Sequence, residues 1–178
     1  RQLSALAAGG ELVLDEGPSS PPEPRWGIGA EERFSVFGTS PAYLRFCEDS
    51  GVSPRRRFDL SALRAVLSTG SILYPRQYDW VATDVGSMPL QSISGGTDII
   101  GCFVLGNPDL PVRRGEAQCR SLGLDVRALS EEPGAAVGEL VCANPFPSRP
   151  IGLWDDASGE RFHNAYFSQH PGYWTHGV

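Results

Sequence analysis

Residues 34–94 alternate between short apolar runs and amphipathic stretches, which is the pattern of strands followed by helices. Strands are predicted within FSVFGT (34–39), LRAVLS (63–68) and MPLQSIS (88–94), and helices within PAYLRFCEDS (41–50) and YPRQYDWVATDV (74–85). Strands that alternate with helices in this order are typical of an open, largely parallel sheet. We therefore expect the first part of the chain to be α/β, a partial sheet with flanking helices.

The helix predicted from Pro41 has signals at both ends. Ser40 occupies the N-cap position, Pro41 suits the first turn, and Gly51 follows the last turn. A further helix is predicted before Gly9–Gly10, with a short strand after it. Residues 16–24 are rich in proline and serine and are expected to form a loop.

Beyond Gly106 the pattern changes to short strands separated by glycine, proline and acidic residues. Strands are predicted within GEAQCRSLG (115–123), LDVRALS (124–130) and GELVCANPF (138–146), and a short aromatic helix within residues 160–174, stopped by Pro171–Gly172. This pattern indicates a small antiparallel sheet or partial barrel. We expect two subdomains, an α/β part over residues 1–105 and a small antiparallel β part over residues 106–178.

The composition is that of a globular protein, because 178 residues with 40% apolar and 20% charged side chains can bury a core. The formal charge of −6 argues against nucleic acid or an anionic membrane as the main partner. No apolar run approaches the roughly 20 residues of a membrane span, and no signal peptide is recognisable. The cysteines stand singly, without C-x-x-C spacing, so we expect reduced core thiols in a cytoplasmic protein.

The first residue and the basic residues of the chain are both unusual. The chain begins with Arg1 and its only methionine is Met88, so we expect that its natural start has been lost. All 15 basic residues are arginines. A mechanism that needs a catalytic lysine therefore cannot be completed within these residues.

Small polar residues gather where three predicted strands end, in FGTSP (37–41), LSTGS (67–71) and SISGGTD (92–98). In open α/β sheets, ligands bind at the carboxyl ends of the strands. Glycines let the backbone approach a ligand closely, and hydroxyl and backbone N–H groups can hold phosphate oxygens. Asp98 supplies the hard oxygen ligand that Mg²⁺ prefers. Together these segments suit a nucleotide–metal site.

Each of these segments also has an ordinary structural interpretation. Gly95–Gly96 can serve a turn, and Asp98 can cap the segment that follows it. Other chemistries fit less well, because the sequence has no G-x-S-x-G elbow, no G-x-G-x-x-G fingerprint and no P-loop. Surface or half-buried structural roles are expected for His163, His170, His176 and the arginines of PRRRF (54–58), for which contact with an anionic ligand is the alternative.

Six segments in order along the chain resemble the adenylate-forming acyl-CoA synthetases: VFGTSPAYL, DLSALRAVLSTGS, SISGGTDIIGCFVLGNP, RRGEAQCRSLGLDV, GELVCANPFPSRPIGLW and HNAYFSQHPGYWTHG. The middle three of these resemble the acetoacetyl-activating branch in particular. The resemblance implies an ATP-dependent acid–thiol ligase of lipid metabolism that uses acetoacetate, ATP, Mg²⁺ and coenzyme A. The carboxylate would attack the α-phosphate of ATP, releasing pyrophosphate, and the coenzyme A thiol would then displace AMP.

The resemblance also implies roles for individual residues. Thr97 would contact the α-phosphate as the catalytic residue, and Asp98 would bind Mg²⁺. Gly70 and Ser71 match the turn that packs against adenine. Gly95 matches a position where acetate-specific relatives carry tryptophan, so its missing side chain would leave room for acetoacetate, and Gly95→Trp would shift preference towards acetate. The expected cofactor-binding residues are Gly70, Ser71, Ser94, Gly95, Gly96 and Thr97, with Asp98 as the metal ligand.

By the same resemblance, parts of the enzyme lie outside these residues. A phosphate loop ending in lysine would precede residue 1, a C-terminal domain with a second lysine would follow, and Val178 stands where an aspartate would hold the ribose. We therefore expect an internal segment of the large N-terminal domain, inactive alone and prone to self-association, with the missing portions of the enzyme as partners. Two alternatives stay open: another short-chain acyl-CoA ligase of the superfamily, and a non-catalytic nucleotide-binding remnant.

Overall fold

The computed structural model describes residues 2–18, 20–130, 132, 134–135 and 137–176. The chain folds into two compact units. The first runs to Ile93 and includes residues 106–118, whereas the second contains residues 94–105 and the chain from Cys119 onward. The single boundary expected at residue 105 therefore differs from this division, because the chain leaves the first unit after Ile93, returns at Gly106 and leaves again after Gln118.

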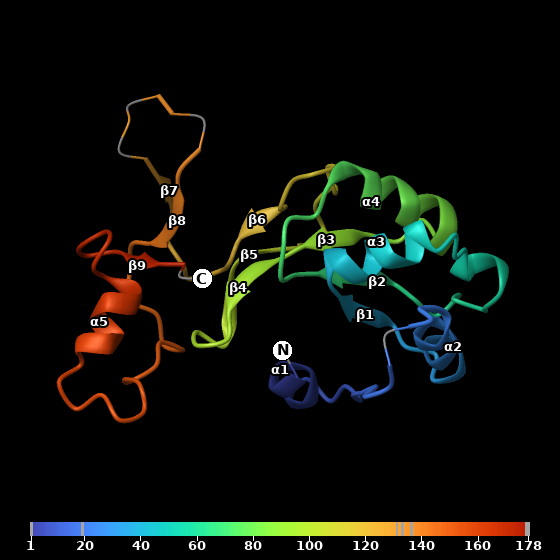
Figure 1. The fold of residues 1–178 in the computed structure, drawn as a ribbon, viewed down its shortest axis with the longest axis horizontal. Helices are drawn as coiled ribbons and strands as arrows, with labels where there is room; N and C mark the ends of the chain where they lie inside the picture. The colour runs from blue at the N-terminus through green and yellow to red at the C-terminus, as the bar shows by residue number, and fades with distance from the viewer. Residues whose placement is uncertain (1, 19, 131, 133, 136, 177–178) are drawn as a thin grey trace. The chain divides into compact units, whose positions relative to one another are not determined.

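A three-stranded parallel sheet in the order β1–β2–β3 forms the centre of the first unit (Figure 1). Its strands are β1 (Val36–Thr39), β2 (Ala65–Ser68) and β3 (Leu90–Ser92). The helices of this unit are α1 (Gln2–Ala7), α2 (Glu23–Glu31), α3 (Pro41–Asp49) and α4 (Pro75–Trp80), with a 3-10 turn at Pro54–Arg56 and a π turn at Val81–Val85 after α4. The predicted alternation of parallel strands and helices is confirmed.

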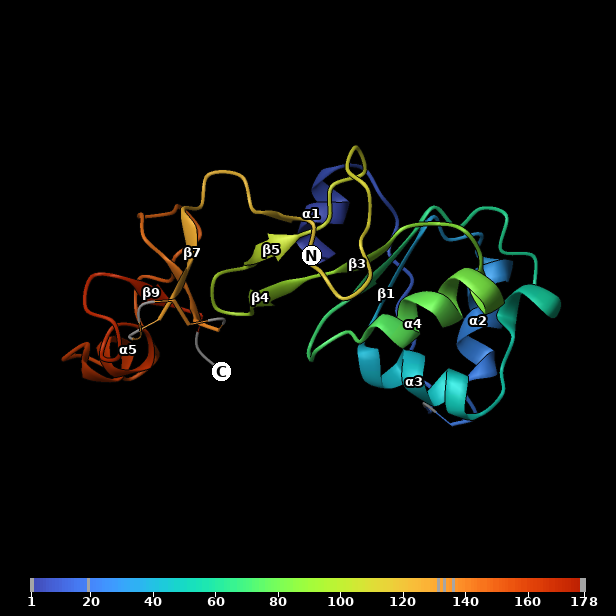
Figure 2. The ribbon, with the colours of Figure 1, turned by 90° about the horizontal axis from the view of Figure 1, so that it is seen from above.

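One face of this sheet packs against α2, α3 and α4 (Figure 2). Phe37, Val66 and Leu90 lie opposite one another on successive strands and belong to the same hydrophobic cluster as the helices. Trp26 from α2 and Leu44 from α3 are fully buried against them. Burial of each such side chain contributes roughly 1.5–3 kcal/mol to the free energy of unfolding, relative to leaving it in water. The cluster therefore holds the helices against the strands.

Helix α3 begins as its sequence predicts. The Ser40 side-chain oxygen accepts a hydrogen bond from the Tyr43 backbone N–H at 3.2 Å, and Pro41 is the first helical residue. Gly51, with φ of +66°, follows the helix in the left-handed region that favours glycine. This helix start therefore lies directly beyond the carboxyl end of β1.

Helix α2 was not predicted, because residues 16–24 read as a loop. The helix contains Gly27 and Gly29, which are poor helix formers. Tertiary packing explains the second glycine, because a Cβ there would lie 1.4 Å from the Phe34 ring. The short strand expected after Gly9–Gly10 is absent, as the described residues that follow α1 are irregular up to α2. Among the described residues, no helix is both long and apolar enough to cross a membrane.

The second unit contains two small antiparallel sheets, whereas the sequence predicted one small antiparallel sheet or partial barrel, beginning only after Gly106. The first has β4 (Ser94–Gly96), β5 (Gly101–Leu105) and β6 (Cys119–Arg120), and the second has β7 (Val126–Leu129), β8 (Glu139–Cys142) and β9 (Trp174–Thr175). Helix α5 (Glu160–Tyr166) precedes β9. The helix expected up to Pro171 therefore stops five residues earlier, and the residues after it include a strand that was not predicted.

Aromatic side chains make up most of the core of the second unit. Trp174, 3% exposed, stacks on Tyr166 with ring centroids 4.0 Å apart and planes 19° from parallel. Phe162 meets Trp174 edge-on at 5.5 Å. The Arg149 guanidinium lies 6.0 Å from the Trp174 ring centroid, within the range of a cation–π contact. These contacts hold α5 against β9.

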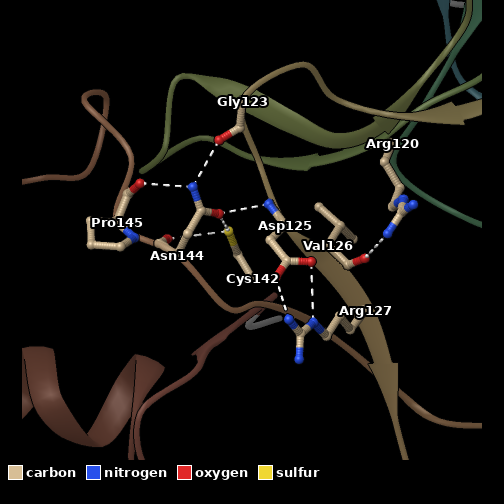
Figure 3. A network of polar contacts seen from close by, with 8 residues as sticks. All are labelled: Arg120, Gly123, Asp125, Val126, Arg127, Cys142, Asn144 and Pro145. Atoms are coloured by element: carbon tan, nitrogen blue, oxygen red, sulfur yellow. Dashed lines mark hydrogen bonds and ion pairs between the residues drawn. The ribbon is translucent and has the colours of Figure 1, made fainter.

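Asn144 joins the turn before β7 to the end of β8 (Figure 3). Its Oδ1 accepts the Asp125 backbone N–H at 2.6 Å, and its Nδ2 donates to the Gly123 carbonyl at 2.9 Å. Arg127 forms a two-pronged contact with Asp125, and this contact lowers the pKa of that carboxyl. The hydrogen bonds of one amide therefore fix where the β7–β8 pair begins.

Candidate functional site

The predicted site residues fall into two groups, one in each unit. Gly70 and Ser71 follow β2 in the first unit, whereas the residues from Ser94 to Asp98 lie in the β4–β5 hairpin of the second. SISGGTD is therefore not one strand end, as the sequence suggested, because β3 stops at Ser92 and a separate antiparallel strand begins at Ser94. Val178, expected at the ribose position, lies outside the described residues.

The parallel sheet places three hydroxyl side chains in a row at its carboxyl edge. Thr39 is opposite Ser68, and Ser68 is opposite Ser92, so all three project from the same face. The Ser68 hydroxyl is buried, and it has no hydrogen-bond partner among the described residues. The sequence pattern singled out the three segments that contain Thr39, Ser68 and Ser92 but not this row, because the row depends on the register of the strands.

The turn after β2 carries the first group. Gly70 has φ of +98°, a conformation that favours glycine, and a Cβ there would meet no atom within 4 Å. Backbone conformation rather than crowding therefore requires the glycine. Gly70 and Ser71 are both exposed, which leaves the turn accessible to a ligand.

The β4–β5 hairpin carries the second group. Its register shifts between Ser94 and Gly95, and the Ile100 N–H donates to the Thr97 carbonyl at 3.1 Å to close the turn. Ile99, 3% exposed, packs into the aromatic core and anchors the turn. The side chains of Thr97 and Asp98 are exposed. The hairpin therefore presents one hydroxyl and one carboxylate side by side at its tip.

Ile100 has φ of +50°, which is uncommon for a β-branched residue. Its side chain is 63% exposed, so burial does not compensate for this conformation. Strained residues of this kind cluster at ligand-binding turns. The strain lies two residues from Asp98 and is consistent with a functional role for the tip.

Gly95 has a backbone reason to be glycine. A Cβ at this position would lie 2.2 Å from the Gly101 carbonyl oxygen and 2.6 Å from the Cys102 Cα on the paired strand. The expectation that glycine here serves to enlarge an acyl pocket is therefore not needed to explain the residue. Gly95→Trp would have to displace these backbone atoms, so a change in acyl selectivity would not by itself report on the size of an acyl pocket.

Two side chains from the C-terminal segment of the second unit contact the hairpin. The Tyr166 hydroxyl donates a hydrogen bond to Asp98 Oδ2. The Ser94 hydroxyl and His176 Nε2 lie 2.9 Å apart. His176 is half-buried, and burial lowers the pKa of its imidazole. The sequence predicted an ordinary role for His176, whereas the structure places it against a predicted site residue.

The arginine-rich segment PRRRF (54–58) makes a hydrogen bond within the first unit. Pro54–Arg56 forms a 3-10 turn, and Arg55 Nη1 donates to the Thr83 carbonyl of the π turn at 3.0 Å. The other two histidines, His163 and His170, lie in and after α5. Among the described residues, the side chain that contacts Asp98 is Tyr166, so the arginines and these two histidines are not assigned to the candidate site.

The hairpin tip fits a magnesium–phosphate complex better than a metal held by protein alone. Within the described ranges, no three or more His, Cys, Asp or Glu side chains group to hold a metal ion. Mg²⁺ needs no such group, because it commonly binds one or two carboxylates and takes its other ligands from water and substrate phosphates. Asp98 is exposed at a turn and can supply that single carboxylate, with the Thr97 hydroxyl beside it.

The chain was compared with protein-family models, with curated proteins and with solved structures. No protein-family model matches the chain. The chain is 44% identical to acetoacetyl-coenzyme A synthetase of Rhizobium meliloti and 41% identical to acetoacetyl-CoA synthetase of Mus musculus, in each case over 98% of its own length. It spans 28% and 27% of the length of these two relatives.

Solved structures are similar in fold. The structure matches acetoacetyl-CoA synthetase from Streptomyces lividans with a TM-score of 0.84 and 39% identity, over 98% of this chain and 28% of that one. It also matches the anthranilate CoA ligase AuaEII, solved with anthranoyl-AMP, with a TM-score of 0.76 and 14% identity, over 94% of this chain and 31% of that one. The second likeness concerns the fold alone. Over 98% of its length the chain is therefore similar to a segment of the acetoacetyl-CoA synthetases, and that segment makes up 27–28% of these relatives.

Proposed function

We propose that the polypeptide carrying these residues activates acetoacetate with ATP and transfers the acyl group to coenzyme A. The observation that carries the proposal is 40–44% identity to acetoacetyl-CoA synthetases over 98% of the chain. In the first step an acetoacetate oxygen bonds to the α-phosphorus of ATP, and the bond to pyrophosphate breaks. In the second step the thiol sulfur of coenzyme A bonds to the acyl carbon and AMP leaves.

Each unit contributes its own residues to this proposal. In the second unit, the exposed Thr97 hydroxyl donates to an α-phosphate oxygen, and Asp98 supplies a carboxylate oxygen to Mg²⁺. Ser94, Gly95 and Gly96 form the strand that carries these two residues to the turn. In the first unit, the exposed turn at Gly70 and Ser71 packs against adenine. Mg²⁺, when bound, neutralises charge on the phosphates.

The test is acetoacetate-dependent exchange of pyrophosphate into ATP by the native polypeptide that contains residues 1–178. We expect exchange by the unmodified protein, and about a 100-fold lower rate for each of two variants. Thr97→Ala removes the hydroxyl that donates to the α-phosphate, and Asp98→Asn removes the carboxylate that binds Mg²⁺. Asp109→Asn is the matched control, since Asp109 is an exposed carboxylate outside the hairpin. We expect residues 1–178 alone to be inactive, because they contain no lysine.

The same assay separates the alternatives. Exchange with acetate or another short acid in place of acetoacetate would favour a different acyl-CoA ligase of the superfamily. ATP binding without exchange for any acid would favour a non-catalytic nucleotide-binding protein. Exchange that Asp98→Asn and Asp109→Asn lower equally would contradict the roles given to the hairpin tip.

We also propose a cytoplasmic enzyme of lipid metabolism. The four cysteines are free thiols, with Cys47 and Cys142 buried and the other two half-buried. Free thiols suit a reducing compartment. Fractionation of the source cells, with the native polypeptide followed by antibody, tests this location.

A further inference from the structure

We propose that Tyr166 is a positioning residue for Asp98, and that its hydroxyl holds the carboxylate in the orientation that binds the metal–ATP complex. The inference rests on the proposed function, because it concerns the same site. Nothing in the sequence pattern pointed to it, since Tyr166 lies 68 positions from Asp98 along the chain. The contact exists only because α5 and the hairpin meet in the second unit.

The Tyr166 ring is itself firmly placed. Only 8% of the residue is exposed, and its ring stacks on Trp174 at 4.0 Å and meets Phe162 edge-on at 5.4 Å. Its backbone carbonyl accepts a hydrogen bond from the buried Thr175 hydroxyl at 3.0 Å. Because both ring and backbone are fixed, the position of the hydroxyl is fixed as well.

Asp98, in contrast, has little to orient it. Its side chain is exposed on a tight turn whose neighbour Ile100 is in an uncommon backbone conformation. The Tyr166 hydroxyl bonds to Oδ2 and leaves Oδ1 for another ligand. A fixed hydroxyl therefore selects one carboxylate orientation before the metal arrives. Hydrogen-bond partners of metal ligands commonly account for about 10–100-fold in metal affinity.

A binding measurement tests this without relying on turnover. We would titrate Mn²⁺, a paramagnetic substitute for Mg²⁺, into the native polypeptide that contains residues 1–178, saturated with a non-hydrolysable ATP analogue. Free Mn²⁺ is followed by electron paramagnetic resonance. We expect Tyr166→Phe to raise the dissociation constant for Mn²⁺ about 10-fold, while metal-free binding of the analogue is unchanged. The substitution keeps the stacked ring, so the core should remain intact, and circular dichroism checks this.

Two further variants make the measurement specific. Tyr173→Phe is the matched control, because it removes a tyrosine hydroxyl from the same segment without touching Asp98. In the Asp98→Asn background, Tyr166→Phe should add nothing, since the carboxylate on which the hydroxyl acts is gone. In pyrophosphate exchange, Tyr166→Phe should raise the Mg²⁺ concentration needed for half-maximal rate and leave the rate at saturating Mg²⁺ within about 3-fold.

The outcomes are distinct. An unchanged Mn²⁺ dissociation constant in Tyr166→Phe would overturn the inference and leave the proposed function standing. Equal losses in Tyr166→Phe and Tyr173→Phe, or an additive loss in the Asp98→Asn background, would also overturn it, because they would indicate general destabilisation. No binding of Mn²⁺ with the ATP analogue by the unmodified protein, together with no exchange, would overturn the proposed function, and this inference with it.

Discussion

His176 shows how one residue acquires a role from its surroundings. Its ring lies 2.9 Å from the Ser94 hydroxyl and meets Phe103 edge-on at 5.3 Å. Burial lowers its pKa from the ordinary 6.5, and the Glu139 carboxylate on β8 opposes that shift more weakly. The neutral imidazole is therefore the form that the folded state favours.

The stability of the second unit should depend on pH through His176. As the pH falls below about 6.5, the imidazole of the unfolded chain takes up a proton before that of the folded chain. The contribution of neutral His176 is therefore fully present above pH 6.5 and is lost as the pH falls towards the folded-state pKa. We expect denaturant unfolding of the protein between pH 5 and pH 8 to show this loss, and His176→Gln to reduce it.

The exposed His163 offers a matched control for that experiment. His163→Gln should leave the pH dependence of the free energy of unfolding as it is in the unmodified protein. If both histidine variants change the pH dependence to the same extent, the Ser94–His176 contact does not govern it.

At the scale of the element, the β4–β5 hairpin is defined by how closely its two strands approach. The carbonyl of Gly101 and the Cα of Cys102 occupy the space that a side chain on Gly95 would need. The next residue, Gly96, has room, because a Cβ there would meet only Ile99 Cγ1, at 3.8 Å. Two adjacent glycines therefore have different reasons to be present.

Alanine at these two positions should have unequal effects. We expect Gly95→Ala to lower the free energy of unfolding by roughly 1–3 kcal/mol, because rigid backbone atoms must move to admit the methyl group. Gly96→Ala should change it by less than about 0.5 kcal/mol. Urea unfolding followed by tryptophan fluorescence measures both. Equal costs at Gly95 and Gly96 would contradict the close approach seen in the hairpin.

At the scale of the whole molecule, large apolar side chains are left in solvent. Trp154 is 94% exposed and Ile151 fully exposed, and both lie in the same irregular segment before α5. In the first unit, Val36 on β1 is 50% exposed, although the strands of a parallel sheet are usually covered on both faces. Apolar surface of this kind favours association.

Residues 1–178 on their own should therefore self-associate. We expect size-exclusion chromatography with light scattering to give a mass above 19.2 kDa, rising with concentration. The double variant Ile151→Ser, Trp154→Ser should shift the distribution towards the monomer, because it removes apolar surface from solvent without touching either core. A sharp peak at the monomer mass for the unmodified chain would refute this expectation.

The local sequence determined those helices and strands that are specified by capping residues or by the spacing of apolar side chains within the element itself. The Ser40–Pro41 start of α3, the apolar runs of β1 to β3 and the change to short antiparallel strands after Gly106 all follow from hydrogen-bonding groups, backbone restrictions and side-chain period. Helix α2 and strand β9 were not predicted, because their local sequences carry no clear signal for a helix or a strand. Gly29 lowers the helix propensity of α2, and the packing of the Phe34 ring against it accounts for the glycine. Strand β9 has two residues and therefore no period to detect.

The resemblance of motifs pointed to the acetoacetyl-activating ligases and, within the chain, to Thr97 and Asp98. The comparisons find acetoacetyl-CoA synthetases as relatives over 98% of the chain. Only the tertiary structure decided that Gly95 is required by the opposite strand and that Tyr166 and His176 contact the hairpin. It also aligned Thr39, Ser68 and Ser92 in one row. Tyr166 and His176 lie 68 and 82 positions from their partners, so only packing brings them to the hairpin. The crowding at Gly95 is closer in sequence, but it depends on the register of the paired strands, which no local propensity encodes.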